Sequence, residues 1–339
     1  MRAVQITEFG GPEVLQFVEI PPPEPGAGEV LIRVAAAGVN YADVRMRAGS
    51  YVRKPPLPAV LGFEASGYIE AVGPGAEAFV TDPSVLEVGA GVIVGDVRGG
   101  YAEFAIAPAD LLFPVPTGKL VEDAAALPVN YLVAWLAVHG KGEVRSGETV
   151  LVHAAGGGVG SAAVQIARLA GARVVATAST PEKLEIAKRA GADITVNYLE
   201  SDFVDEIRNQ LGSQRPIDLV IDSVGGPTLV DSLELLARWG RLVGFGQASD
   251  TAAQLDLYTS LIPQQLDLRF FGRGSLTTSR NPRDRARLFD AMQRVTELWA
   301  MDKIQPVAVE RVPMTEVRDV HTRMGSRSHS GKILLDPAV

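Results

Sequence analysis

The chain has 339 residues, of which 47% are hydrophobic and 21% charged, and it carries a net charge of −8 at pH 7. This length predicts two domains, and the acidic balance argues against a nucleic-acid-binding surface, which needs clustered Lys and Arg. The absence of cysteine excludes disulfides, thiolate zinc sites and a cysteine nucleophile.

The first third of the chain combines short β patterns with frequent Gly and Pro. Its first strand pattern is interrupted by Glu8, so no secretory signal is expected and the protein is predicted to be cytoplasmic. Further strands are predicted at residues 30–35, 67–72, 92–94 and 102–107. This end of the chain is therefore expected to form a β-rich domain.

A strand, a glycine turn and a helix are predicted over residues 150–168. The spacing matches the dinucleotide fingerprint G-x-G-x-x-G, with alanine in the first glycine position. Glycines let the backbone approach a ligand, and the helix that follows presents free amides to an anion. The residues expected to bind a dinucleotide are Ala155, Gly157, Gly158, Val159 and Gly160. The same glycines make a membrane helix implausible here, and none is predicted elsewhere.

The next strand, at residues 172–177, ends where the cofactor's adenosine ribose would be bound. An acidic residue there would bind the ribose 2′-hydroxyl of NAD, but none precedes Glu182. Lys183 and the hydroxyls of Ser179 and Thr180 suit a 2′-phosphate instead, which favours NADPH over NADH. Thr180 is also expected to cap a helix, which is compatible with either cofactor.

Strands and helices alternate in the rest of this region. The predicted elements are a strand at 194–197, a helix at 202–211, a strand at 219–222, a helix at 228–237 and a strand at 242–246. This alternation predicts a doubly wound parallel sheet covered by helices on both faces, an α/β fold. A long helix at 282–301 precedes short strands near 307–309 and 332–335, and this β-rich end is expected to complete the first domain.

Two other kinds of chemistry find no support. The four histidines are scattered without metal-ligand spacing, and His153 is expected to be a packed residue rather than a base. No Gly-x-Ser-x-Gly motif is present, which removes the main hydrolase alternative.

Six short motifs lie outside the glycine turn, at residues 37–43 (AGVNYAD), 47–51 (RAGSY), 61–67 (LGFEASG), 100–104 (GYAEF), 222–226 (DSVGG) and 330–335 (SGKILL). Together they resemble the quinone oxidoreductase branch of the medium-chain dehydrogenase/reductase superfamily, over essentially the whole chain. The resemblance implies a GroES-like β-barrel catalytic domain, here residues 1–126 and 267–339. It implies a Rossmann NADPH-binding domain inserted between these two segments, here residues 127–266.

The resemblance also bears on metal chemistry. Zinc-dependent relatives carry His after the glycine of the Leu-Gly-x-Glu stretch and use cysteines as further ligands, whereas this chain has Phe63 there and no cysteine. No metal site is therefore expected. Without a Lewis acid a simple alcohol or ketone is hard to polarise, while quinones, conjugated enones and enoyl thioesters accept hydride without a metal.

The catalytic residues that the resemblance implies are Asn40, Asp43 and Tyr51, in a cleft near the nicotinamide. Asn40 could hold a carbonyl oxygen, and Tyr51 could donate a hydrogen bond or a proton. From the residues alone, a turn-stabilising Asn–Asp pair and a packed aromatic would be equally acceptable interpretations.

On the cofactor side, Lys183, Tyr198 and Arg327 match the family's 2′-phosphate contacts. Gly244 and Phe245, at the end of a strand, resemble the segment that passes under the nicotinamide. Many relatives carry Thr where this chain has Val133, so a hydroxyl is missing, and Asn130 is a possible substitute donor.

These observations predict a zinc-independent, NADPH-dependent reductase of quinones or related conjugated carbonyl compounds. A reductase of 2-enoyl thioesters or enones is the enzymatic alternative. An NADPH-binding protein whose catalysis is incidental is an alternative of another class. The family also implies a homodimer, for which the residues themselves show no interface.

Overall fold

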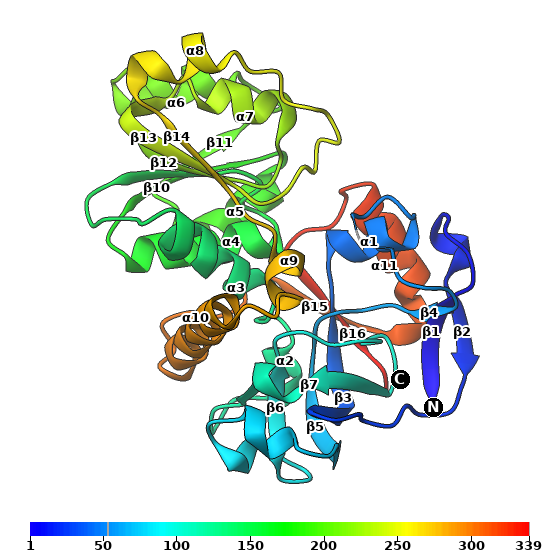
Figure 1. Cartoon of the computed structure of the whole chain (residues 1–339). Helices are drawn as coiled ribbons and strands as arrows, with labels where there is room; N and C mark the ends of the chain where they lie inside the picture. Colours follow the sequence, from blue (N-terminus) through cyan, green and yellow to red (C-terminus); the bar gives the residue numbers. More distant parts are fainter. Residues whose placement is uncertain (53, 339) are drawn as a thin grey trace. The chain divides into compact units, whose positions relative to one another are not determined.

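The computed structural model describes residues 1–52 and 54–338. Contacts between residues divide the chain into two compact units. The first consists of Met1–Val129, Met292–Asp302 and Ala308–Val339, and the second of Asn130–Ala291 and Lys303–Val307. Both ends of the chain thus belong to the first unit, and the second is inserted in sequence between its parts (Figure 1).

The first unit is built mainly of strands. Within the described residues they form a seven-stranded sheet in the order β15-β16-β3-β5-β6-β8, where β7 also pairs with β3, and a three-stranded sheet β2-β1-β4. The strands are β1 (Arg2–Ile6), β2 (Gln16–Glu19), β3 (Glu29–Val39), β4 (Ala59–Val60), β5 (Ala65–Val72), β6 (Gly91–Val94), β7 (Phe104–Pro108), β8 (Leu112–Pro114), β15 (Val309–Pro313) and β16 (Lys332–Asp336).

The C-terminal strand completes the larger sheet. β16 pairs antiparallel with β3, with Ile333 opposite Val39, so the β-rich end of the chain joins the β-rich beginning as the sequence predicted. Val30, Ile32 and Ile69 are buried in the core of this unit, whereas Arg33 of β3 and Glu70 of β5 are exposed. Its helices are α1 (Tyr41–Arg47), α2 (Val121–Ala124) and α11 (Val317–Gly325), and α11 packs against α1.

The second unit contains a parallel sheet. In the part of the chain that the structure describes, it has six strands in the order β11-β10-β9-β12-β13-β14, all parallel. The strands are β9 (Thr149–Val152), β10 (Arg173–Ala178), β11 (Ile194–Asn197), β12 (Ile217–Asp222), β13 (Leu236–Gly244) and β14 (Asp267–Phe270). The sheet confirms the predicted doubly wound α/β fold.

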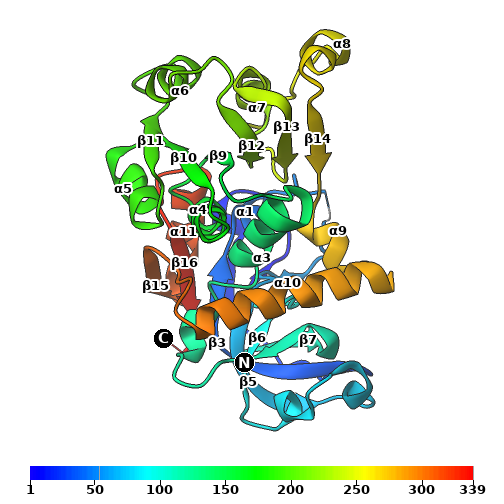
Figure 2. The same cartoon turned by 90° about the vertical axis from the view of Figure 1, so that its left-hand side faces the viewer.

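Helices cover both faces of this sheet. α4 and α5 lie on one face and α6 and α7 on the other (Figures 1 and 2). The helices are α3 (Asn130–Trp135), which continues as a π-helical turn (Leu136–Lys141), α4 (Gly158–Leu169), α5 (Pro181–Arg189), α6 (Phe203–Leu211), α7 (Gly226–Ser232), α8 (Leu257–Ser260) and α9 (Arg273–Thr277). The long helix α10 (Pro282–Ala300) runs from this unit into the first. No helix among the described residues is long and apolar enough to cross a membrane.

Two boundaries differ from the sequence prediction. The helix predicted at 228–237 ends at Ser232, and β13 begins at Leu236, which pairs with Ile217 of β12. The register of this pairing shifts before Arg241, and Trp239 in the shifted stretch has a positive φ of 65°. The Rossmann region was predicted to end at residue 266, whereas β14 beyond that point pairs with β13, with Gly244 opposite Phe270. The contact-defined second unit continues to Ala291.

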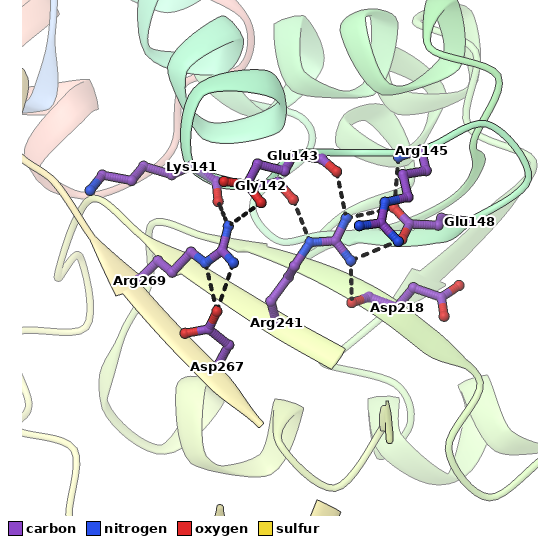
Figure 3. A network of polar contacts seen from close by, with 9 residues as sticks. All are labelled: Lys141, Gly142, Glu143, Arg145, Glu148, Asp218, Arg241, Asp267 and Arg269. Atoms are coloured by element: carbon purple, nitrogen blue, oxygen red, sulfur yellow. Dashed lines mark hydrogen bonds and ion pairs between the residues drawn. The ribbon is translucent and has the colours of Figure 1, made fainter. Parts of the chain in front are cut away.

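A polar network ties the π-helical turn to the amino-terminal side of the parallel sheet (Figure 3). Arg241 in β13 is 9% exposed and donates to both carboxylate oxygens of Glu148, at 2.9 and 2.6 Å. It also donates to the carbonyls of Gly142, Glu143 and Asp218. All five N–H groups of this guanidinium therefore have acceptors.

Candidate functional site

The glycine turn between β9 and α4 is shaped by close backbone approaches. The N–H of Ala155 donates to Thr177 O at 3.0 Å, which joins the turn to the neighbouring strand β10. A Cβ atom on Gly160 would lie 2.3 Å from Ala154 O, so no side chain fits there. A Cβ on Gly157, the residue before α4, would meet only Ala154 O at 3.4 Å.

The turn leads directly into the 12-residue helix α4, whose first amides have no partner within the helix. A helix N-terminus of this kind binds the pyrophosphate of a dinucleotide through its N–H groups and its dipole. The residues present thus fit a dinucleotide, and binding by Ala155, Gly157, Gly158, Val159 and Gly160 stays a prediction.

Lys183, predicted to bind a 2′-phosphate, lies against the glycine turn. A Cβ on Gly156 would come within 2.4 Å of Lys183 Cβ, so the aliphatic stem of the lysine packs directly over the turn. Thr180 caps α5 by accepting from the N–H of Lys183 at 3.3 Å, which holds the lysine in the first turn of that helix. The backbone and stem of Lys183 are thereby held against the glycine turn, and phosphate binding by its ammonium stays a prediction.

The other predicted 2′-phosphate contacts come from three places. Ser179 follows β10, and Tyr198 follows the adjacent strand β11, where its N–H donates to Ala178 O at 3.2 Å. Because the two parallel strands end at the same edge, both residues lie at the edge that carries the glycine turn. Arg327 belongs to the first unit, where it follows α11 with a positive φ of 59°, and its contact with the cofactor stays a prediction.

Asn130 and Val133 lie on α3, and both are buried. A Cβ on Gly158 would lie 2.3 Å from Asn130 Nδ2, so the asparagine amide packs against the start of α4. Val133 brings no hydrogen-bonding group. Asn130 is therefore the polar side chain that α3 brings to the glycine turn, and its role as a donor to the cofactor stays a prediction.

Gly244 and Phe245 end β13, and the N–H of Phe245 donates to Asp222 O at 3.1 Å. The ring of Phe270 covers one side of Gly244, because a Cβ there would lie 2.4 Å from Phe270 Cε1. The sequence interpretation missed this aromatic cover, which leaves only the other side of Gly244 for a cofactor.

His153 is a packed residue, as expected. It is 3% exposed, and both ring nitrogens lie 2.8 Å from hydroxyl oxygens, Nδ1 from Thr177 Oγ1 and Nε2 from Ser232 Oγ. Because Ser232 donates its own proton to Thr228 O, it accepts from Nε2–H, and Nδ1 then accepts from Thr177. Burial lowers the pKa of His153, which keeps the ring neutral.

In the first unit, Asn40 and Asp43 lie at the start of α1 and are both buried. The Asn40 N–H donates to Asp43 Oδ2 at 2.9 Å. The Asn40 side chain donates from Nδ2 to Glu64 at 2.8 Å, and its Oδ1 accepts from Lys332 at 3.0 Å. The predicted turn-stabilising Asn–Asp contact is thus present, and the Asn40 amide is held by two charged groups.

Asp43 belongs to a second buried cluster with Tyr101, His321 and Arg47. Burial raises the pKa of Asp43 to about 7, against the lowering effect of the Asn40 N–H and of Lys332. Burial likewise raises the pKa of Tyr101. His321 Nε2 lies 3.4 Å from the Tyr101 hydroxyl, with the two rings edge to face.

Tyr51, the third predicted catalytic residue, follows α1 in a loop. It is half-buried, and its N–H donates to Arg45 O at 3.1 Å, which ties the loop to the helix. The three predicted residues therefore lie around α1, with Asn40 and Asp43 at its start and Tyr51 just after its end. Their catalytic roles stay predictions.

The comparisons with known proteins agree with this architecture. The alcohol dehydrogenase GroES-like domain family matches residues 26–117, and the zinc-binding dehydrogenase family matches residues 158–294. The quinone oxidoreductase of Mus musculus is 38% identical over 248 residues, 73% of each chain. A mycobacterial protein solved with NADPH is 34% identical with a TM-score of 0.87, over 99% of this chain and 100% of that one. The quinone oxidoreductase of Escherichia coli, also solved with NADPH, is 30% identical with a TM-score of 0.87, over 99% of this chain and 100% of that one.

This chain belongs to the quinone oxidoreductase branch of the medium-chain dehydrogenase/reductase superfamily. The first unit is its GroES-like domain and the second its Rossmann domain. The CurK enoyl reductase has a similar structure, with 27% identity and a TM-score of 0.85, over 99% of this chain and 98% of that one. The family thus includes members named for different acceptors.

The sequence did not predict a role for two charged residues of this chain. Glu64 lies in the motif at residues 61–67, and Lys332 lies in the motif at residues 330–335. Each is a charged residue inside an otherwise apolar stretch, and this pattern is typical of a buried, paired group. In residues 1–52 and 54–338, no group of three His, Cys, Asp or Glu side chains could hold a metal ion.

The stability of the GroES-like domain is expected to depend on pH through His321 and Asp43, with opposite signs. Burial and the nearby Arg47 lower the pKa of His321 from 6.5 to about 3, so its contribution is full above pH 6.5 and is lost as the pH falls toward 3. The pKa of Asp43 is raised from 3.8, so its contribution is full below pH 3.8 and is lost as the pH rises toward 7.

Between these limits the two contributions oppose each other, and His321→Gln removes one of them. Relative to the wild type, the unfolding free energy of this variant is expected to rise by up to about 1.4 kcal/mol for each unit by which the pH falls below 6.5. Asp43→Asn is the matched variant, and its unfolding free energy relative to the wild type is expected to rise as the pH increases above 3.8. Urea unfolding at several pH values measures both slopes, and pH profiles parallel to that of the wild type would contradict the assignment.

Proposed function

We propose that this chain is a zinc-independent, NADPH-dependent oxidoreductase that reduces quinones or related conjugated carbonyl compounds. The observation that carries the proposal is the packing of Lys183 over the glycine turn, with Gly156 against its stem. From this packing we infer that the Lys183 ammonium binds the 2′-phosphate on the adenosine ribose, the group by which NADP differs from NAD. Structural relatives of the same family are solved with NADPH.

The cofactor, NADPH, supplies the hydride. The first amides of α4 would hold its pyrophosphate, and Lys183, Ser179 and Tyr198 would bind the 2′-phosphate. Arg327 of the GroES-like domain is proposed to bind the same phosphate. Asn130 orients the cofactor in place of the threonine hydroxyl that Val133 lacks.

Zinc independence is proposed from the chemistry of the available side chains. The chain has no cysteine, and Phe63 occupies the place of the histidine ligand of zinc-dependent relatives. The name of the matching zinc-binding dehydrogenase family describes that wider family. Quinones and conjugated carbonyls accept a hydride without a metal because their reduced oxygen is stabilised by conjugation.

The acceptor is proposed to bind near Asn40 and Tyr51. Asn40 donates a hydrogen bond to the carbonyl oxygen that gains negative charge as the hydride arrives. A proton from water or from the Tyr51 hydroxyl then neutralises that oxygen. Asp43 holds the backbone of Asn40 and thereby the start of α1.

A second candidate function is reduction of a 2-enoyl thioester or enone. It is supported by the similarity to the CurK enoyl reductase. The same residues would serve, with the hydrogen bond of Asn40 directed to the thioester oxygen. A third, non-catalytic hypothesis is an NADPH-binding protein, which predicts tight NADPH binding and negligible turnover with every acceptor.

One experiment separates these functions. Turnover is measured with 1,2- and 1,4-quinones, an enone and an enoyl thioester, each with NADPH and NADH, with and without a chelator. We expect NADPH-dependent quinone reduction that survives chelation and an absence of stoichiometric zinc by metal analysis. Faster turnover of the enoyl thioester would favour the second function, and activity lost on chelation would disprove zinc independence.

The chain is also proposed to form a homodimer and to be cytoplasmic. β14 is an edge strand of the parallel sheet, and Phe270 on it is 57% exposed. Leu257, Tyr258 and Ile262 nearby along the chain are also large and exposed. An exposed strand edge with apolar side chains is suited to pairing with a second copy. Sedimentation equilibrium is expected to give twice the chain mass.

A further inference from the structure

Glu64 and Lys332 form an ion pair buried in the GroES-like domain. Glu64 is fully buried and Lys332 is 4% exposed. The ammonium of Lys332 donates to Glu64, to Val39 O at 3.2 Å and to Asn40 Oδ1 at 3.0 Å, so all three of its protons have acceptors. Glu64 Oε1 accepts from the N–H of Val129 at 2.7 Å. Four segments distant in sequence thus meet at this pair.

The two charges determine the orientation of the Asn40 amide. Lysine can only donate and an ionised glutamate can only accept, so Oδ1 must face Lys332 and Nδ2 must face Glu64. A flipped amide would place the Nδ2 donor against the Lys332 ammonium and the Oδ1 acceptor against the Glu64 carboxylate. The pair therefore holds one amide orientation against rotation.

In this orientation, one of the two Nδ2 protons of Asn40 makes only a weak hydrogen bond. The first Nδ2 proton is donated to Glu64 at 2.8 Å, whereas among residues 1–52 and 54–338 the second has only the Gly38 carbonyl, at the limiting distance of 3.5 Å. A cation on the carbonyl oxygen of an amide draws electron density from its nitrogen, which makes the remaining N–H a stronger donor. Asn40 is thereby prepared to donate rather than to accept.

We propose that the buried Glu64–Lys332 pair is a positioning and polarising device that presents the second, weakly bonded N–H of Asn40 to the carbonyl oxygen of the acceptor. This inference rests on the proposed function, in which Asn40 binds that oxygen. It narrows the acceptor to compounds whose reduced form carries negative charge on a carbonyl oxygen. Glu64 and Lys332 act through Asn40 and are positioning residues.

Gly38 supports the proposal independently, because the pair needs the space of its missing side chain. A Cβ on Gly38 would lie 2.3 Å from Glu64 Oε2 and 2.9 Å from Lys332 Cε. Gly38→Ala therefore displaces both partners without altering a charge or a hydrogen-bonding group. Gly325→Ala is the matched control in the same domain, since its Cβ would meet only Val44 Cγ1 at 3.9 Å.

The main test is the double variant Glu64→Gln/Lys332→Met. It removes both charges together, and the glutamine carbonyl still accepts from Val129, so folding is expected to be retained. We expect kcat for quinone reduction to fall about 10- to 100-fold, because the donor is misplaced and no longer polarised. The Kd for NADPH, measured by fluorescence, is expected to stay within twofold of the wild type.

Gly38→Ala should reproduce the loss of kcat, and Gly325→Ala should not. A folded double variant with wild-type kcat would overturn the inference, as would a loss confined to NADPH binding. A readout independent of turnover is the Asn40 side-chain NH2 resonance pair, assigned with Asn40→Ser. We expect the chemical shifts of this NH2 pair to change in the double variant and in Gly38→Ala. Unchanged shifts would overturn the inference even if the wild type reduced no acceptor. That last result, wild-type protein without turnover, would count against the proposed function alone.

Discussion

Replacing Lys183 with alanine is expected to lower the preference for NADPH over NADH by about 10- to 100-fold in kcat/KM. One charge-assisted hydrogen bond to a phosphate contributes about 1.5–3 kcal/mol, which converts to that range. The lysine stem lies over Gly156, and its backbone is held by the cap of α5, so little entropy is lost when the ammonium binds. The loss should appear with NADPH only, because NAD lacks the 2′-phosphate.

Two variants make this result specific to Lys183. Lys183→Gln keeps most of the stem that packs on the turn and removes only the charge, so it should show most of the loss. Lys188→Ala, on the exposed last turn of the same helix, should leave both cofactors unaffected. Steady-state kinetics with each cofactor measures the ratio, and a ratio unchanged in Lys183→Ala would refute the assignment.

Replacing Arg241 with methionine is expected to destabilise the Rossmann domain by about 3–5 kcal/mol, the usual cost of removing one partner of a buried ion pair. The side chains of Arg241 and Glu148 are only 11% and 17% exposed, and they meet at 2.6 Å. The substitution leaves the Glu148 carboxylate without its cation and removes the Arg241 donor from three backbone carbonyls (Figure 3). Calorimetric unfolding measures the loss.

The same loss should depend on pH. Burial alone would raise the pKa of Glu148, but its hydrogen bonds to Arg241 and to the N–H of Arg145 hold that pKa below 4.5. The contribution of the pair is therefore full above pH 4.5 and is lost as the pH falls below it, so the variant and the wild type should converge in acid. Glu297→Gln, in an exposed ion pair with Arg294, is the control and should cost less than about 1 kcal/mol. A difference independent of pH would assign the effect to packing rather than to charge.

The sequence predicted the second unit well because its signals are local. The strand at 194–197 has the predicted bounds, the glycine turn lies between β9 and α4 as expected, and the alternation of strands and helices determines a parallel sheet. The predicted helix at 228–237 was too long because residues 236 and 237 belong to β13, whose pairing with β12 no local pattern reveals. The strand β14 was assigned to the wrong side of a boundary for the same reason.

The candidate site divides in the same way. The cofactor residues around Lys183 follow from spacing, because the ends of adjacent parallel strands meet at one edge. The partners of Asn40 do not follow from spacing, since Glu64 and Lys332 are separated by 268 positions in the chain. The aromatic cover of Gly244 likewise depends on how β14 pairs with β13.

By itself, the sequence determined the α/β fold, the dinucleotide turn and the family, because each depends on residues close together in the chain or on motifs in a fixed order. Only the tertiary structure decided how the charges within the apolar motifs are used. A buried charge must find its partner wherever the fold supplies one, so Lys332 meets Glu64 across the sheet, and the amide of Asn40 is oriented between them.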